Sequence, residues 1–210
     1  MPILKFEEEI PIGVIEERKS IRAFSKQDIP DAVLQEILYA GLRAPSPKNR
    51  QPWYFLVSRS GAKREVLITD MEYSVQAALA RESGRRDLTM ALESVEILRQ
   101  APVVIFVCYR LGTVESHDDG VDWPIKASDL EVVDLLSVGA AIENILLTAA
   151  ELGLGGLWCG DILYAYQDFM RSFPTSYPLV SAVCLGYPAQ NPPLTSRYPL
   201  SHCCCFLDKD

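Results

Sequence analysis

Apolar residues recur at intervals of three and four in several segments, and this spacing predicts one buried face of a helix. The first such stripe spans residues 31–42, where Pro30 suits the first helical turn. A second stripe ends before Pro102, and a third lies within residues 162–173. The apolar positions are Val33, Leu34, Ile37, Leu38, Gly41 and Leu42 in the first stripe, Leu88, Ala91, Leu92, Val95 and Leu98 in the second, and Tyr166, Phe169 and Phe173 in the third.

Short continuous apolar runs predict the strands of a sheet. They lie at residues 53–57, 103–109, 157–159 and 179–185. These strands and the helices do not alternate strictly in the βαβ order, so the expected class is α+β, with a sheet sandwiched by helices. Neither a linker nor an internal repeat divides the sequence, which predicts a single domain over residues 1–210.

The segment 130–152 predicts a longer helix of unusual composition. From residue 137 to 150 it is apolar or small on almost every side, interrupted mainly by Glu143 and Asn144. A helix that is apolar all round is buried all round. It is either the central core helix of a monomer or a helix covered by a second subunit, and we favour the dimer because small residues allow close helix approach. Gly153 is the expected C-cap.

Composition and charge narrow the possible partners. The chain has 210 residues, of which 49% are hydrophobic, so it can bury one sizeable core. Its formal net charge of −8 argues against nucleic acid and against an anionic membrane. Residues 6–9 read Phe-Glu-Glu-Glu, unlike a basic and then apolar secretory leader, so we expect a cytoplasmic protein.

Cysteine and histidine give no support for metal or hydrolytic chemistry. Cys108, Cys159 and Cys184 lie in apolar or glycine-flanked runs and are expected to be small buried residues, whereas residues 203–205 are three consecutive cysteines. None of the six forms a C-x-x-C pair, and we expect no metal site. His117 and His202 have no serine or cysteine partner at a recognised spacing.

Two polar clusters carry the candidate chemistry. The first contains Arg18, Lys19, Ser20 and Arg22, whose guanidinium groups can meet phosphate or carbonyl oxygens at two points each. Taken alone, it could be a solvated charged helix end. The second cluster spans residues 45–53 and reads Pro-Ser-Pro-Lys-Asn-Arg-Gln-Pro-Trp. Its prolines predict an ordered, non-helical loop with polar side chains in defined directions. Together the clusters suit a planar, phosphorylated ligand such as flavin mononucleotide (FMN).

With these motifs the sequence resembles the FMN-dependent nitroreductase family. The matching motifs are Arg18-Lys19-Ser20-Ile21-Arg22-Ala23-Phe24, the loop 45–53, the segment 149–160, and Leu185-Gly186-Tyr187-Pro188-Ala189 followed by Arg197-Tyr198-Pro199-Leu200. Their order and spacing span nearly the whole chain. The resemblance implies a nitroreductase-like fold with a central, mainly antiparallel sheet flanked by helices, and a homodimer with the long central helix and both FMN sites at its interface.

The same resemblance implies roles for individual residues. Arg18, with Lys19, Ser20 and Arg197, corresponds to the phosphate site, and Arg22 to a cation at the pyrimidine edge of the flavin. A positive charge there helps the ring accept negative charge. The loop positions that correspond to contacts from the partner subunit are Ser46, Pro47 and Asn49, and Pro45 and Gln51 of the same loop are also expected to bind the cofactor. The positions that correspond to the segment beside N5 and O4 of the flavin are Trp158, Cys159, Gly160 and Asp161. Asp161 replaces a more usual glycine, and its charge would lower the reduction potential or exclude anionic acceptors.

The implied activity is a ping-pong reaction, in which NAD(P)H donates electrons and a small oxidised acceptor, such as a nitroaromatic or a quinone, receives them. Residues 153–155 do not continue into a Rossmann fingerprint, so we expect no dedicated dinucleotide domain. The expected lid over the pocket is either residues 71–86 or residues 112–127; in the second, Trp123 would lie over the flavin or anchor the loop. Two alternatives stay open: a flavin storage or sensing protein, and an enzyme of the same fold that dehydrogenates or dehalogenates one metabolite.

Overall fold

The computed structural model describes residues 13–82, 84–110 and 127–205. In this part of the chain four strands form one antiparallel sheet in the order β1-β2-β4-β3. They are β1 (Trp53–Ser58), β2 (Val103–Tyr109), β3 (Gly155–Cys159) and β4 (Leu179–Gly186). All four predicted strands are confirmed, and with them the α+β class. This order leaves β3 at one edge of the sheet, where its outer side can contact other segments of the chain.

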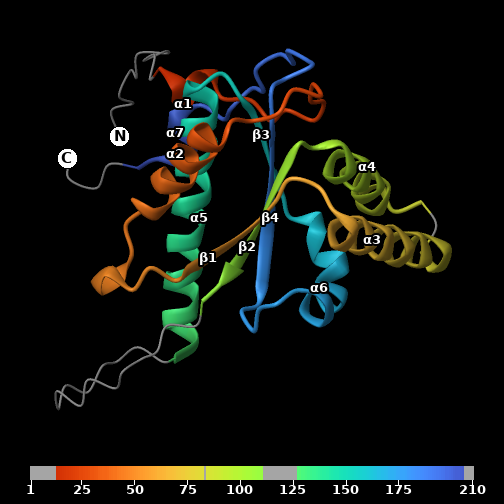
Figure 1. Cartoon of the computed structure of the whole chain (residues 1–210). Coiled ribbons are helices and arrows are strands. Elements are labelled where there is room, and N and C mark those ends of the chain that lie inside the picture. The colour runs from red at the N-terminus through yellow and green to blue at the C-terminus, as the bar shows by residue number, and fades with distance from the viewer. Residues whose placement is uncertain (1–12, 83, 111–126, 206–210) are drawn as a thin grey trace.

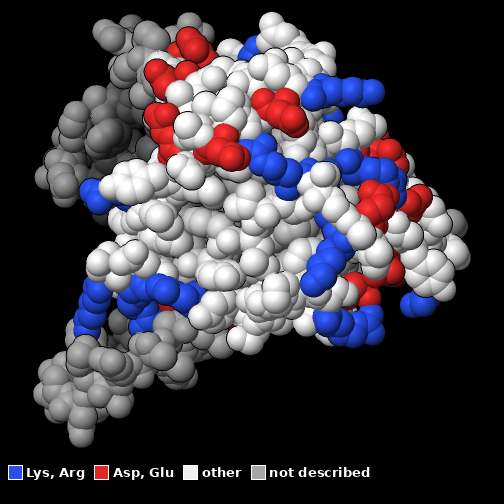
Figure 2. All heavy atoms as spheres, viewed as in Figure 1, with Lys and Arg blue, Asp and Glu red and all other residues white. Residues whose placement is uncertain are grey.

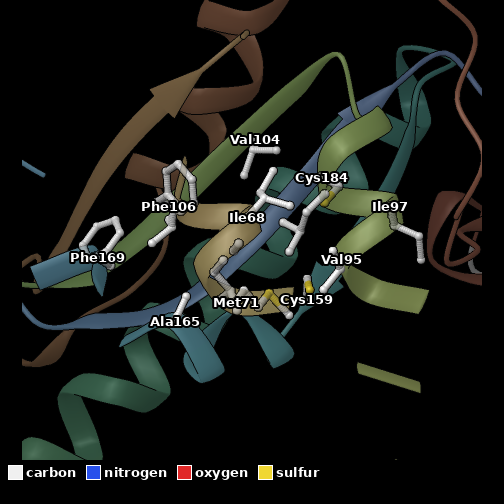
Figure 3. Close-up of a cluster of buried hydrophobic side chains, with 14 of the residues drawn as sticks. Ile68, Met71, Val95, Ile97, Val104, Phe106, Cys159, Ala165, Phe169 and Cys184 are labelled. Carbon is white, nitrogen blue, oxygen red and sulfur yellow. The ribbon is translucent and has the colours of Figure 1, made fainter. Parts of the chain in front are cut away.

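Helices cover both faces of this sheet (Figure 1). One face carries α2 (Asp31–Leu42) and α5 (Ala127–Glu151), and the other carries α3 (Ala62–Arg81), α4 (Arg86–Gln100), the 3-10 turn η2 (Asp161–Ala165) and α6 (Tyr166–Ser172). Strand β2 supplies both cores, because its residues alternate between the faces. Val103, Ile105 and Val107 face α2 and α5, whereas Val104, Phe106 and Cys108 face α3, α4 and α6. Figure 3 shows buried side chains of the core that faces α3, α4 and α6.

The helix predictions are confirmed for α2, α4 and α5, within a few residues at their ends. The segment predicted as one helix over residues 162–173 is divided into η2 and α6. Helix α3 was not predicted. Three short elements complete the described chain: α1 (Val14–Glu17), η1 (Pro47–Asn49) and α7 (Leu200–Cys203).

Helix α5 ends as predicted. Gly153 has a φ of 76°, its N–H donates to Ala150 O, and the N–H of Leu154 donates to Ala149 O. This is the Schellman arrangement, in which glycine takes the left-handed position after the helix. The turn reverses the chain into β3, so the helix end positions the strand that borders the site.

One face of α5 is uncovered in the single chain, whereas the alternative of a core helix in a monomer required it to be buried all round. Val132 is 58% exposed and Leu136 69% exposed, and Ala140 is half-buried one turn further along. Tyr39 and Leu42 of the neighbouring α2 are also exposed. By length and composition, residues 131–151 could cross a membrane. The buried side of the helix, however, packs against the sheet through Ile142 and Ile145, as the core helix of a globular domain does.

Candidate functional site

The segment that contains Ser20 and Ile21 lies along the edge of β3 that faces away from β4. Ser20 forms a parallel bridge with Gly156, and the Ile21 N–H donates to Gly156 O at 3.0 Å. Gly155 makes this approach possible, because a Cβ there would lie 2.6 Å from the Ile21 side chain. Because Gly155 has no side chain, the segment that carries Arg18, Ser20 and Arg22 can lie beside the sheet.

The same segment forms one wall of a cavity of about 800 Å³. The opposite wall comes from the proline-rich segment 192–200 near the other end of the chain. The cavity is lined by four basic side chains, Arg18, Lys19, Arg22 and Arg197, by the hydroxyl groups of Ser20, Thr195 and Tyr198, and by a single acidic residue, Glu16. The structure thus brings together the four residues expected at the phosphate site and Arg22, which was expected at the pyrimidine edge of the ring. Clustered guanidinium, ammonium and hydroxyl donors suit a phosphate group.

An ion pair and a hydrogen bond from outside the motif hold two of the basic side chains in place. Arg18 Nε lies 3.4 Å from Glu143 Oε1 of α5, and Lys19 Nζ donates to Asn191 Oδ1 at 2.8 Å. Arg22 Nη1 donates to the Ser20 carbonyl at 3.4 Å. Glu143 stood out in the sequence as a charge within an apolar helix, whereas Asn191 carried no signal.

A second group of predicted residues lies where β3 ends. The Trp158 indole N–H donates to Ser181 Oγ at 2.8 Å, and the Ser181 hydroxyl donates to Cys159 O at 3.1 Å. Gly160 follows with an ordinary φ of −76°, and a Cβ built on it meets nothing within 4 Å. The turn therefore has an open side at Gly160 that a flat ring could approach.

The side chains on either side of Gly160 point elsewhere. The Cys159 thiol lies in the core among residues such as Met71 and Val95 (Figure 3). Burial raises the pKa of this thiol to about 11, and the negative charge of Asp161 adds to the effect. The Asp161 carboxylate accepts a hydrogen bond from Ser94 Oγ of α4 at 2.6 Å. Only the backbone of Cys159 can therefore face a ligand at this edge.

The loop 45–52 is held at the opposite end of α5. Arg50 Nη2 donates to Asp134 Oδ2 at 2.8 Å, and Tyr109 Oη donates to the same oxygen at 3.2 Å. Arg110 Nη2 donates to Gln51 O at 2.8 Å, and the Ser46 hydroxyl accepts the Gln51 N–H at 3.0 Å. The loop is therefore held by α5, by residues at the end of β2, and by a hydrogen bond within the loop itself.

The loop conformation is unusual. Lys48, Asn49 and Gln51 all have φ values near +50°, a region that side chains disfavour. The prediction of a non-helical loop holds in its dihedral angles, although residues 47–49 form one turn of 3-10 type. Such backbone strain persists where the surrounding structure enforces it, and it is concentrated at functional sites.

The two polar clusters do not meet within one chain. Arg18 contacts Glu143 and Arg50 contacts Asp134, and these two partners are nine positions apart along α5, which corresponds to roughly 14 Å of helix. No residue of the loop 45–52 lines the cavity described above. Figure 1 shows this separation, with the loop that leads into β1 far from α1 and α7. The uncovered apolar face of α5 lies between them.

The first of the two expected lids is wrong for most of its length. Residues 71–81 belong to α3, and Met71 and Val75 are fully buried in the core, so this part cannot move over a pocket. The second, residues 112–127, lies outside the described residues except for Ala127 at the start of α5.

The surface charge agrees with a small ligand. Figure 2 shows acidic and basic side chains interspersed over the face in view, with no broad basic field on that face. The basic residues that line the cavity are therefore a local feature of a chain with a net charge of −8.

Comparison with known proteins places these features in a family context. The model of the Nitroreductase family matches residues 15–187. A protein from Archaeoglobus fulgidus, provisionally named an NADH dehydrogenase/NAD(P)H nitroreductase, is 31% identical over 183 residues, covering 84% of each chain. The 5,6-dimethylbenzimidazole synthase of Rhodospirillum rubrum is 28% identical over 177 residues, covering 84% of this chain and 81% of that protein.

A solved structure extends this similarity to three dimensions. It is the crystal structure of a Desulfovibrio desulfuricans protein, provisionally named a nitroreductase, in complex with FMN. It is 28% identical to this chain and has a TM-score of 0.65, covering 94% of this chain and 95% of its own.

Proposed function

Because the chain belongs to the nitroreductase family, we propose that it is an FMN-dependent oxidoreductase that passes electrons from NAD(P)H to a small oxidised acceptor, such as a nitroaromatic or a quinone. The observation that carries the proposal is the cavity in which Arg18, Ser20, Arg22 and Arg197 converge. Because the cavity lies beside the edge of β3, a ligand bound in it can extend along that strand.

The residues present fit FMN. Gly156 C=O faces away from β4, since it accepts the Ile21 N–H, and alternation along an antiparallel strand turns the backbone of Trp158 to the same free edge. The distance from Gly156 to Gly160 is roughly 13 Å at 3.3 Å per residue. A ligand with its phosphate at Ser20 and its ring at Gly160 would extend along this edge, where both ends find suitable donors or open space.

In this proposal each residue has a physical task. Arg18, Lys19, Ser20 and Arg197 bind the phosphate, and Arg22 places a positive charge near the pyrimidine edge of the ring. The turn at Gly160 lets the backbone approach the ring closely. When bound, FMN supplies the chemistry of accepting a hydride from a nicotinamide and passing electrons on to an acceptor.

A second copy of the chain completes the site. The loop with Pro45, Ser46, Pro47, Asn49 and Gln51 lies too far from the cavity of its own chain to contact the same ligand. The exposed apolar face of α5 offers the surface that a partner would cover. We infer a homodimer with two shared sites, in the cytoplasm, with neither nucleic acid nor membrane as a partner.

The test is FMN uptake followed by two separate half-reactions. The purified chain should bind one FMN and show the visible absorption of a flavin. Without oxygen, NADH or NADPH should bleach this absorption, and menadione or a nitroaromatic should restore it. Uptake of FMN without bleaching would favour the storage or sensing alternative. A chain that takes up no FMN would overturn the proposal.

One observation favours a second candidate, an enzyme that acts on a single metabolite. The chain is 28% identical to a 5,6-dimethylbenzimidazole synthase over most of both sequences. Under this alternative, bound FMN would be reduced but generic acceptors would reoxidise it slowly. Comparable turnover with several quinones and nitroaromatics would favour the general reductase instead.

A further inference from the structure

A hydrogen bond between two distant parts of the chain holds the carboxylate of Asp161, which follows β3 by two residues. Ser94 of α4 donates a hydrogen bond from Oγ to Asp161 Oδ2 at 2.6 Å, and both side chains are half-buried. The Cys159 thiol lies beside them: burial and the Asp161 charge raise the pKa of this thiol, and hydrogen bonding from Ser94 acts against that rise. The three groups therefore meet beneath the turn at Gly160.

The carboxylate of Asp161 is not neutralised by a cation. Among the described residues it takes part in no ion pair, and Ser94 is its side-chain donor. Its formal negative charge is therefore held at Ser94, and Asp161 is the next residue after Gly160, whose backbone is open to a ligand. A charge in a partly dry site acts over several ångströms more strongly than it does in water.

Tethering changes what such a charge does. A mobile carboxylate would swing into solvent when a neighbouring group gains negative charge, and its repulsion would fade. A carboxylate that is hydrogen-bonded to a helix cannot retreat in this way, so it opposes the added charge in full. Ser94 is thus placed to determine how strongly Asp161 acts on a ring at this edge.

Resting on the proposed function, we propose that Ser94 is a positioning residue that holds the Asp161 carboxylate beside the Gly160 turn and thereby lowers the reduction potential of FMN bound there. Ser94 itself need not touch the flavin. The effect acts through Asp161, so it disappears when the carboxylate is removed.

The test is the midpoint potential of bound FMN, measured by equilibration with a reference dye in FMN-loaded protein. Asp161→Asn should favour reduction by about tenfold, which is about 30 mV for a two-electron couple. Ser94→Ala should shift the equilibrium in the same direction by a smaller factor, about threefold. In the double variant Ser94→Ala/Asp161→Asn, the serine change should add nothing to the shift of Asp161→Asn.

Two controls separate positioning from general damage. Ser94→Thr keeps the hydroxyl and should retain the wild-type potential. Thr89→Ala removes another hydroxyl from α4, one that donates a hydrogen bond to Arg85 O in the first turn of the helix, and should leave the potential unchanged.

The outcomes distinguish this proposal from the one on which it rests. Wild-type protein that binds FMN, combined with an unchanged potential in Ser94→Ala, would overturn the role of Ser94 alone. An equal shift from Ser94→Ala with and without the Asp161 carboxylate would do the same, since the effect would then not pass through Asp161. Wild-type protein that takes up no FMN would overturn the proposed function, and this proposal with it.

Discussion

Arg50 of the loop forms an ion pair with Asp134 of α5, with Nη2 and Oδ2 2.8 Å apart and the Asp134 side chain only 1% exposed. Tyr109 donates to the same carboxylate from the end of β2. A buried carboxylate with two donors from different elements is a fixed point for the loop. The strained conformation of Lys48, Asn49 and Gln51 is maintained from this point.

Removing the carboxylate should therefore destabilise the fold. Asp134→Ala leaves Arg50 and Tyr109 without their partner, at a cost of about 3 kcal/mol, since breaking a buried ion pair exposes the desolvation penalty of the remaining charge. For a chain of this size that lowers the melting temperature by roughly 6–12 °C. Glu82→Ala, which breaks an exposed ion pair with Arg85 at the end of α3, is the control and should leave the melting temperature nearly unchanged. Equal effects of the two changes would refute the structural role of Asp134.

Arg18 and Lys19 should differ in their effect on FMN affinity. Lys19 is already bound to Asn191, whereas Arg18 contacts Glu143 through Nε and can offer its terminal nitrogens to a phosphate. A bidentate, charge-assisted contact is worth roughly 1.5–3 kcal/mol, so Arg18→Ala should weaken FMN binding by about tenfold or more, and Lys19→Ala by less. Fluorescence titration of the apoprotein measures both. Equal affinities in the two variants would count against the phosphate role of Arg18.

Two glycines on the same strand and turn should respond in opposite ways. Gly160→Ala places its Cβ in open space at an ordinary φ, so unfolding stability should change by less than about 0.5 kcal/mol while FMN affinity falls. Gly155→Ala places its Cβ against Ile21 and should destabilise the fold by about 1–3 kcal/mol. Denaturation and FMN titration of both variants test this. Unchanged FMN affinity in Gly160→Ala would place the ring elsewhere.

The six cysteines should divide into two groups. Burial raises the pKa of Cys108 to about 12 and that of Cys159 to about 11, and it raises the pKa of Cys184 as well. Residues 203–205 are exposed. A thiol reagent at pH 8 should therefore titrate three cysteines in the native protein and all six after unfolding. Rapid reaction of a fourth thiol in the native state would contradict the burial of this group.

The same buried thiols predict how stability depends on pH. Their pKa values are higher in the folded state than the ordinary thiol value near 9, so the unfolded chain loses its thiol protons first as the pH rises. Their contribution is fully present below about pH 9 and is lost progressively towards about pH 11–12. Urea denaturation at pH 8 and pH 10.5 measures this. Replacing Cys159 by alanine should reduce the dependence.

Local sequence signals account for much of the fold. Helix α2 was predicted to the residue because a strong apolar stripe follows Pro30, and β2 because its seven residues are continuously apolar. Helix α3 was missed, since its buried Leu67, Ile68, Met71 and Val75 are sparse among charged residues. These four residues do form an apolar stripe at helical spacing, but the many polar and charged residues between them make it hard to recognise.

The site was predictable only in part. Arg18, Ser20 and Arg197 were placed together by resemblance, since nothing local in the sequence joins its two ends. The contacts of Ser94 with Asp161 and of Asp134 with Arg50 join residues 67 and 84 positions apart, and they exist only once the sheet and helices have packed. Local patterns cannot report such tertiary pairs, because either residue alone reads as an ordinary surface side chain.

The central claim is that each FMN site combines the basic cavity of one chain with the loop of another, and mixed dimers test it most directly. Arg18→Ala disables the cavity, and Asn49→Gly removes a loop side chain while accepting the φ of 55° at that position. Each variant alone should bind FMN weakly. A mixed dimer of the two, isolated with two affinity tags, carries one site with both defects and one intact site. It should therefore bind one FMN per dimer with wild-type affinity, whereas binding no better than that of the two parents would contradict the shared site.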